Sequence, residues 1–218
     1  MRGSGHRRRA DLSGRSHPGF PEVTDQLSWY VARAAGLTSW LLVAASILWG
    51  LFLSTGVLRS RAGRPWMLDL HRFLGGLSVS FVAVHLVALA ADTYVAFGWR
   101  ELLVPMASEW RPGAVAWGVV AFWLLVAVQV TSMLRRRLVS ERIWRAVHGS
   151  SFILFGAGTV HAIEAGSDVT SPIVALPLGI ATLGVLGLTW WRVLAPVPEN
   201  PATLRAAARV TTGSAPNT

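Results

Sequence analysis

The sequence predicts an all-α fold, a multi-pass transmembrane helical bundle with five predicted spans. Hydrophobic residues make up 52% of the 218 residues and charged residues only 14%, whereas a soluble domain has about 25% charged residues. The apolar residues also lie in five long segments that contain no Asp, Glu, Lys or Arg. A helix needs roughly 20 apolar residues to cross the hydrocarbon core of a bilayer, and each segment approaches or exceeds that length. A soluble globular domain is therefore not expected.

The five segments are residues 34–58, 73–91, 112–134, 146–163 and 169–191. The first is longer than the roughly 7–15 apolar residues of a signal peptide, so it is expected to remain in the protein as a helix. The other four contain 19, 23, 18 and 23 residues, within the range of about 17–25 for a membrane span. Polar, Pro-rich or Gly-rich tails flank the segments. We therefore divide the chain into a flexible basic N-terminal tail (1–27), a transmembrane domain (28–194) and a flexible C-terminal tail (195–218).

The placement of arginine predicts the orientation of the spans, because short cytoplasmic loops carry an excess of basic residues. Nine arginines lie in the loops after the first and third spans, two lie after the second and none after the fourth. The nine are Arg59, Arg61, Arg64, Arg72, Arg135, Arg136, Arg137, Arg142 and Arg145. This pattern predicts a protein of the plasma (inner) membrane with a cytoplasmic C-terminus. The N-terminal tail would then lie outside although it carries five arginines, so its side of the membrane is left open.

Composition also limits the chemistry and the partners. All 20 basic residues are Arg and many follow apolar segments, which is the pattern of membrane topology; a lipid bilayer is the expected partner and nucleic acid is not. Cysteine is absent, which excludes disulfides, thiolate-bound zinc and iron–sulfur clusters. Six tryptophans near the span ends are interpreted as interfacial anchors; they are Trp66, Trp99, Trp110, Trp144, Trp190 and Trp191.

Four histidines belong to two of the spans, where ionisable residues are rare and usually functional. His71 and His85 belong to the second span, and His148 and His161 to the fourth. These spans run in the same direction, so residues at equal distances from the helix start lie at equal depth. His85 follows His71 by 14 residues and His161 follows His148 by 13, which corresponds to about 21 and 19.5 Å along a helix. We expect an inner pair, His71 and His148, and an outer pair, His85 and His161.

Each pair has the composition of a haem site, because two neutral imidazoles at one depth supply both axial nitrogens of a haem iron. Two haems between spans two and four are therefore expected. The facing of the histidines fits unevenly: at about 100° per residue, 14 steps return to within about 40° of the starting face, but 13 steps end about 140° away. A bend at Gly149, Gly156 or Gly158, or haems on different sides of the fourth span, would explain the difference.

Other uses of these histidines stay open. Each histidine alone is compatible with helix packing, and membrane histidines also serve metal transport. A transport site gathers its ligands around one ion, often with carboxylates. The two histidine levels are about 20 Å apart, and no carboxylate lies within the five apolar segments. This arrangement does not favour a transport site. A haem-free membrane transporter or assembly factor is therefore kept as the alternative function, behind the haem protein.

The pattern His-x13-His on one span and His-x12-His two spans later resembles the ferric reductase-like transmembrane domain. That family includes NADPH oxidases, ferric reductases and the haem subunit of the bacterial periplasmic methionine sulfoxide reductase. The segments Asp69-Leu-His-Arg-Phe-Leu-Gly-Gly-Leu77 and Trp144-Arg-Ala-Val-His148 are similar to its small bacterial members, and the resemblance covers residues 29–191. It implies that His71 and His148 bind an inner b-type haem and that His85 and His161 bind an outer one.

The resemblance also implies transmembrane electron transfer, from a cytoplasmic or membrane donor to an outer acceptor such as ferric iron, quinone, oxygen or a partner reductase. The chain departs from the full-length oxidases, because their first span and their C-terminal flavin and nicotinamide domains have no counterpart in it. No flavin or nicotinamide site is therefore expected in this chain. A separate flavoprotein or quinone-linked protein would supply the electrons, and the chain would be the membrane haem subunit of an oxidoreductase.

Residues beside the inner histidines have two interpretations each. Arg72 and Arg145 lie within three residues of His71 and His148, where their guanidinium groups would pair bidentately with haem carboxylates. The positive-inside rule equally predicts arginine there. Gly75 and Gly76, one turn after His71, either leave room for a flat macrocycle or allow close helix packing.

Overall fold

The computed structural model describes residues 23–55, 64–92, 95, 97–135 and 137–194. Every regular element within these residues is a helix, which confirms the predicted all-α class. The helices are α1 (Val23–Thr55), α2 (Arg64–Ala90), α3 (Trp99–Leu103), α4 (Pro112–Leu134), α5 (Glu141–Gly149), α6 (Ser151–Ala165) and α7 (Pro172–Leu194). Residues 1–22 of the predicted N-terminal tail and all of the predicted C-terminal tail lie outside the described residues.

Five stretches of helix in the described residues are long and apolar enough to cross a membrane, as the sequence predicts. They are Leu27–Ser54, Pro65–Ala90, Pro112–Leu134, Glu141–Ala165 and Pro172–Leu194. Each predicted segment overlaps one of them. α1 and α2 begin earlier than predicted, because a helix continues through charged residues such as Arg33, Asp69 and Arg72 that an apolar segment leaves out. The chain is a multi-pass helical membrane protein.

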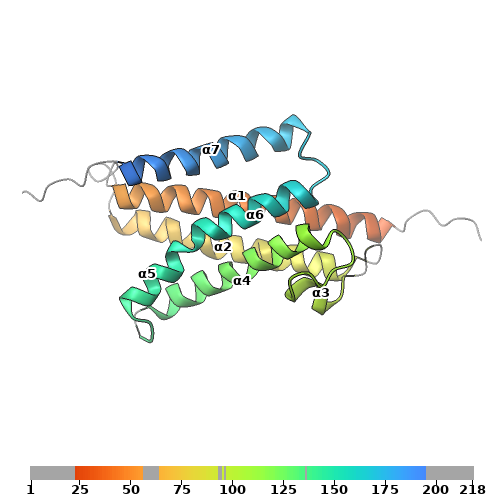
Figure 1. The fold of residues 1–218 in the computed structure, drawn as a ribbon, viewed down its shortest axis with the longest axis horizontal. Coiled ribbons are helices and arrows are strands. Elements are labelled where there is room, and N and C mark those ends of the chain that lie inside the picture. The colour runs from red at the N-terminus through yellow and green to blue at the C-terminus, as the bar shows by residue number, and fades with distance from the viewer. Residues whose placement is uncertain (1–22, 56–63, 93–94, 96, 136, 195–218) are drawn as a thin grey trace, which may run out of the picture.

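The fourth span consists of two helices, α5 and α6, that meet at Ser150. The Ser150 N–H lies 3.1 Å from the carbonyl oxygen of Val147 and 3.3 Å from that of Ala146, and its hydroxyl donates to Val147 at 2.6 Å. α5 departs from the direction of α6 (Figure 1). The interruption lies beside Gly149, one of the three glycines at which the sequence allows a bend. A constant rotation per residue therefore does not relate His148 on α5 to His161 on α6.

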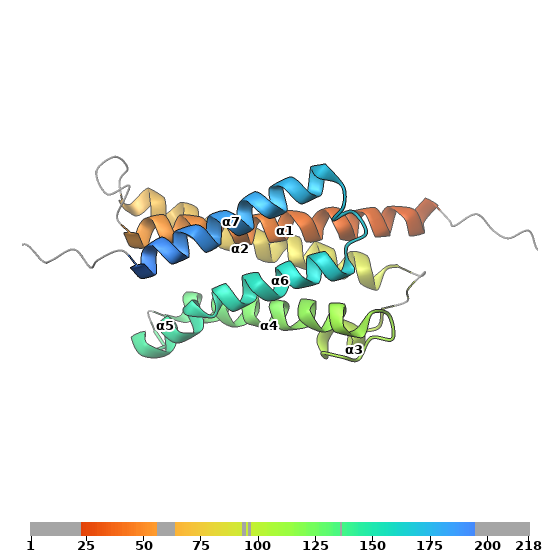
Figure 2. The ribbon, with the colours of Figure 1, turned by 45° about the horizontal axis from the view of Figure 1, so that its top comes forward.

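The helices form two groups that lie side by side, with α1, α2 and α7 in one and α3, α4, α5 and α6 in the other (Figure 2). α1 packs against α2 and α7, and α4 packs against α6. Trp40 of α1 joins the groups: its indole N–H donates to the Thr159 hydroxyl of α6 at 2.9 Å, and its ring stacks on Phe155 with ring centres 5.3 Å apart. These two contacts of Trp40 hold α6 of the second group against α1 of the first.

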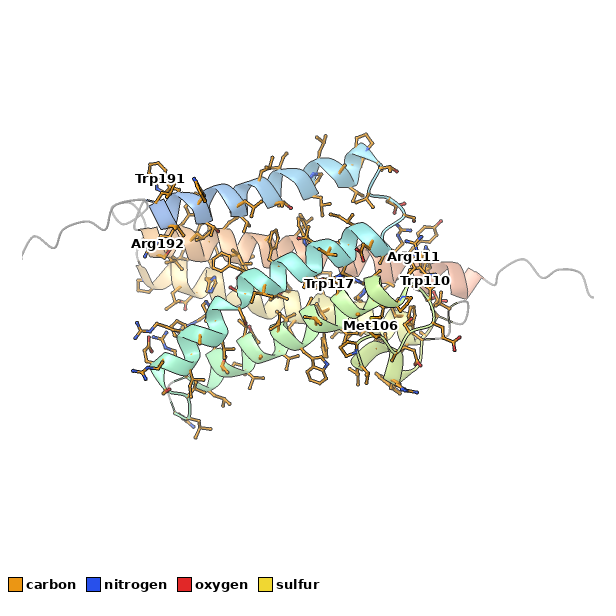
Figure 3. The ribbon with its side chains drawn as sticks, in the orientation of Figure 1. Met106, Trp110, Arg111, Trp117, Trp191 and Arg192 are labelled. Carbon is orange, nitrogen blue, oxygen red and sulfur yellow. The ribbon has the colours of Figure 1, made fainter. Side chains whose placement is uncertain are left out.

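The helix termini gather at two ends of the molecule (Figure 1). α1 and α7 finish, and α2 and α5 begin, at one end, which we call the basic end. Its described arginines are Arg64, Arg72, Arg135, Arg137, Arg142, Arg145 and Arg192. α1 begins at the opposite end, which also contains α3 and the α6–α7 connection. Figure 3 shows Trp191 and Arg192 at the basic end and Trp110 and Arg111 at the opposite end.

Candidate functional site

The four histidines singled out in the sequence come together as two pairs. The ring centres of His71 on α2 and His148 on α5 are 5.9 Å apart, with ring planes at 71°. The ring centres of His85 on α2 and His161 on α6 are 6.3 Å apart, with ring planes at 77°. Both histidines of the fourth span therefore face α2. The pairs are those that helix depth predicts.

A cavity of about 220 Å³ lies beside the outer pair, between the two helix groups. Side chains from α1, α2, α4 and α6 line it, and apart from the two histidines most of them are apolar, including Val82, Phe122 and Leu154. The outer imidazoles therefore border a mostly apolar space.

Arg33 is a charged residue in the wall of this cavity. Its guanidinium forms an ion pair with Asp168 and a hydrogen bond to the Ser167 hydroxyl, and it lies 5.5 Å from the centre of the Trp29 ring. Sequence reasoning did not single out this arginine. The available signal was that Arg33 is the only charged residue between positions 27 and 54.

Hydrogen bonds to helix backbone hold three of the four imidazoles. Nδ1 lies 3.0 Å from the Ser46 carbonyl oxygen in His71, 2.7 Å from that of Ala32 in His85, and 2.8 Å from that of Ala114 in His161. A carbonyl only accepts hydrogen bonds, so in each ring Nδ1 carries a hydrogen, and in the neutral ring Nε2 then keeps its lone pair. This is the hydrogen-bonded form in which protein imidazoles bind metals.

A glycine follows each of these carbonyl groups by four residues, that is, by one helical turn. The glycines are Gly50 after Ser46, Gly36 after Ala32, and Gly118 after Ala114. A Cβ added at Gly36, Gly50 or Gly118 would lie 3.0, 3.3 or 2.8 Å from the nearest ring atom of His85, His71 or His161. The missing side chain therefore lets each imidazole reach the backbone carbonyl. We call each such arrangement a carbonyl–glycine site.

Sequence reasoning missed these three glycines, although a signal for two of them was present. Gly36 and Gly50 are 14 residues apart on α1, the same separation as His71 and His85 on α2. By contrast, a Cβ added at Gly76 would meet no atom within 4 Å, and one added at Gly75 would meet the Gln129 side chain at 3.4 Å.

His148 is held in a different way. Its buried Nδ1 has no hydrogen-bond partner in the part of the chain that the structure describes. Its ring stacks on Trp144, with ring centres 4.9 Å apart and planes at 21°. Trp144 also contacts the Arg135 guanidinium, which lies 3.6 Å from the centre of the indole ring.

Arg72 and Arg145, the two arginines predicted beside the inner pair, lie at the surface of the basic end. The Arg72 side chain is 57% exposed and pairs with Asp69 at 3.5 Å. The Arg145 side chain is 70% exposed and pairs with Glu141 at 3.7 Å. Exposed ion pairs of this kind contribute little to stability, so both guanidinium groups can exchange these partners for another carboxylate.

The geometry of both pairs fits a metal ion with two axial imidazole ligands. Ring centres are roughly 6 Å apart in such a centre, because each metal–nitrogen bond is about 2 Å long and each nitrogen is about 1 Å from its ring centre. The observed 5.9 and 6.3 Å agree with this value. In the described residues no group of three or more His, Cys, Asp or Glu side chains is placed to hold a metal ion. The histidines therefore offer two protein ligands at each level.

These features define a class: a helical membrane protein whose second and fourth spans carry facing histidines at two depths. Residues 31–159 match the family model of the ferric reductase like transmembrane component. Because this match covers more than half of the chain, the protein belongs to that family, as the resemblance of its sequence predicts. Neither the comparison with curated proteins nor that with solved structures finds a match. Membership of this family indicates transmembrane electron transfer in general terms.

Proposed function

We propose that this protein transfers electrons across the membrane as a two-haem b-type cytochrome. His71 and His148 hold the inner haem, and His85 and His161 hold the outer one. The observation that carries the proposal is the presence of two histidine pairs, at two depths, with ring-centre distances suited to axial ligation. Two imidazoles alone leave most positions of an iron ion unfilled, and the four nitrogens of a porphyrin complete its coordination.

The surrounding residues support this assignment. A bound haem supplies a one-electron redox centre. The carbonyl–glycine sites fix the ring orientation of His71, His85 and His161 and favour the neutral tautomer with Nε2 free to bind a metal. The side chains that line the cavity beside the outer pair are mostly apolar, and the polarity of the surroundings is one of the factors that set a haem potential. Arg72 and Arg145, at the basic end, would be available to pair with the carboxylates of an inner haem.

The same proposal includes the partners and the orientation. Residues 28–194 form the haem-binding domain in the plasma (inner) membrane, with the basic end and the C-terminus in the cytoplasm. A separate flavoprotein or quinone-linked protein would deliver electrons at the level of His71 and His148. An acceptor on the other side, such as ferric iron, a quinone, oxygen or a partner reductase, would receive them at the level of His85 and His161.

A haem assay of the purified protein tests the proposal directly. In protein expressed with a full supply of haem, the pyridine haemochrome spectrum should give two b-type haems per chain. Both should be low-spin in the ferric state, because each iron has two imidazole ligands. A protein that purifies folded but without haem would support the haem-free transporter or assembly factor instead.

The orientation gives a second expected result. A reporter fused after Trp191, near the end of α7, should report a cytoplasmic location, because α7 finishes at the basic end (Figure 1). A reporter placed at Glu109, between α3 and α4, should report the outside. Reversed readings would reverse the proposed direction of electron flow while leaving the haem sites unaffected.

Gly118→Ala should weaken binding of the outer haem. The new Cβ would lie 2.8 Å from Nδ1 and Cε1 of His161, so the ring must move and lose its hydrogen bond to Ala114. Loss of such a bond typically costs 10–100-fold in metal affinity, so about that loss is expected in haem titrations. Gly113→Ala on the same helix is the matched control, because a Cβ there meets no atom within 4 Å. Equal effects of both changes would show that the carbonyl–glycine site is unimportant.

A further inference from the structure

His148 lacks the carbonyl–glycine site that each of the other three histidines has. Its buried Nδ1 has no hydrogen-bond partner in the described part of the chain, whereas Nδ1 of His71, His85 and His161 lies within hydrogen-bond distance of a backbone carbonyl oxygen. A different contact must therefore set the orientation of the His148 ring.

Trp144 takes the place of the missing carbonyl. The indole ring stacks on His148, and three other groups fix it in turn. Its N–H lies 3.4 Å from the Ser132 hydroxyl, and the Arg135 guanidinium lies 3.6 Å from its centre. Glu141 holds Arg135 with contacts of 2.9 to 3.1 Å. The stack sets the plane of the imidazole, but it supplies no acceptor for Nδ1.

We propose that Trp144 is the positioning residue for His148, whereas a backbone hydrogen bond positions each of the other three histidines. Because the stack supplies no hydrogen-bond acceptor, His148 is the weakest of the four haem ligands. The inference rests on the proposed function. A hydrogen bond from Nδ1 raises the basicity of the ligating nitrogen, and ligands without that support typically bind 10–100-fold less tightly. The inner haem is therefore the more readily released of the two.

The rate of haem release tests the order of the ligands. We expect transfer of the inner haem to apomyoglobin to be about 10-fold faster than transfer of the outer haem, or more. Trp144→Leu should make release of the inner haem faster still, whereas Val130→Gly, at an exposed position on α4, should leave the order of release unchanged. An inner haem that is released no faster than the outer one would overturn the proposal.

Variants of Trp144 test the stack by a spectroscopic signature. The electron paramagnetic resonance signal of a ferric bis-histidine haem depends on the angle between its two imidazole planes. Trp144→Leu should change the inner-haem signal. Trp144→Phe, which retains a flat ring, should keep the wild-type signal. Trp191→Leu, which replaces an exposed tryptophan at the same end, should also leave the signal unchanged. An unchanged signal in Trp144→Leu contradicts the positioning role. A wild-type protein without haem would instead refute the proposed function itself, so the two failures are distinguishable.

Discussion

His85→Ala or His161→Ala will reduce the haem content from two per chain to one. In the proposed assignment each change removes one axial ligand of the outer haem, while the pair of His71 and His148, with ring centres 5.9 Å apart, is left in place. A single imidazole leaves the haem five-coordinate and weakly held. The pyridine haemochrome assay on purified protein measures the loss, with chain concentration determined independently.

The reciprocal variants are the matched controls. His71→Ala and His148→Ala should remove the inner haem and keep the outer one, so the two classes of variant should retain haems with different reduction potentials. If every single variant lost both haems, the two pairs would form one cooperative site and the assignment to two levels would be wrong. A variant that kept two haems would show that its histidine is not a ligand.

The largest functional effect is expected for electron transfer across a membrane. In proteoliposomes that contain reductant and face an external ferric acceptor, His85→Ala should abolish transfer while the inner haem can still be reduced chemically. The reason is distance, because the two histidine levels divide a hydrocarbon core of about 30 Å into shorter steps. Transfer should also be electrogenic, with about 2.3 kcal/mol per electron for each 100 mV of membrane potential.

The control for that experiment is a variant with two haems and an unrelated change. Leu183→Ala suits this purpose, because Leu183 lies on α7 and is 71% exposed. Its transfer rate should equal that of the wild type. Transfer at the wild-type rate in His85→Ala would place the outer haem off the electron path and exclude the proposed relay.

The helical class, the five spans and the pairing of the histidines were predictable because each depends on spacing along one helix. The bounds of 112–134 agree with α4 from end to end, since Arg111 and Arg135 border an uninterrupted apolar segment. α3 was not predicted, because a helix of five residues has no periodicity to detect. A bend at Gly149, Gly156 or Gly158 was one of two possibilities that the sequence left open, and the structure interrupts the span at Ser150, beside Gly149. That both His148 and His161 face α2 is known only from their ring contacts.

The site was less predictable where one helix meets another. Sequence spacing showed four histidines, but it did not show that Gly36, Gly50 and Gly118 lie against three of their rings. Interpreting six tryptophans as anchors also grouped residues with different contacts. Trp66, Trp99, Trp190 and Trp191 are 58–70% exposed, but Trp110 packs on Phe97 and Trp144 stacks on His148. Contacts between distant segments distinguish these roles, and a hydropathy pattern contains no information about them.

For the proposed cytochrome, the carbonyl–glycine sites imply an order of haem insertion during biosynthesis. His71 and His85 are positioned by α1, and His161 is positioned by α4, so each of these imidazoles is oriented within its own pair of neighbouring helices. A nascent chain that has inserted only α1 and α2 already presents two oriented imidazoles, one at each level, but no second ligand for either iron. Under the proposed function, stable haem insertion would then wait until α5 and α6 leave the ribosome and enter the bilayer beside α2. A chain truncated after α4 should insert into the membrane and remain colourless.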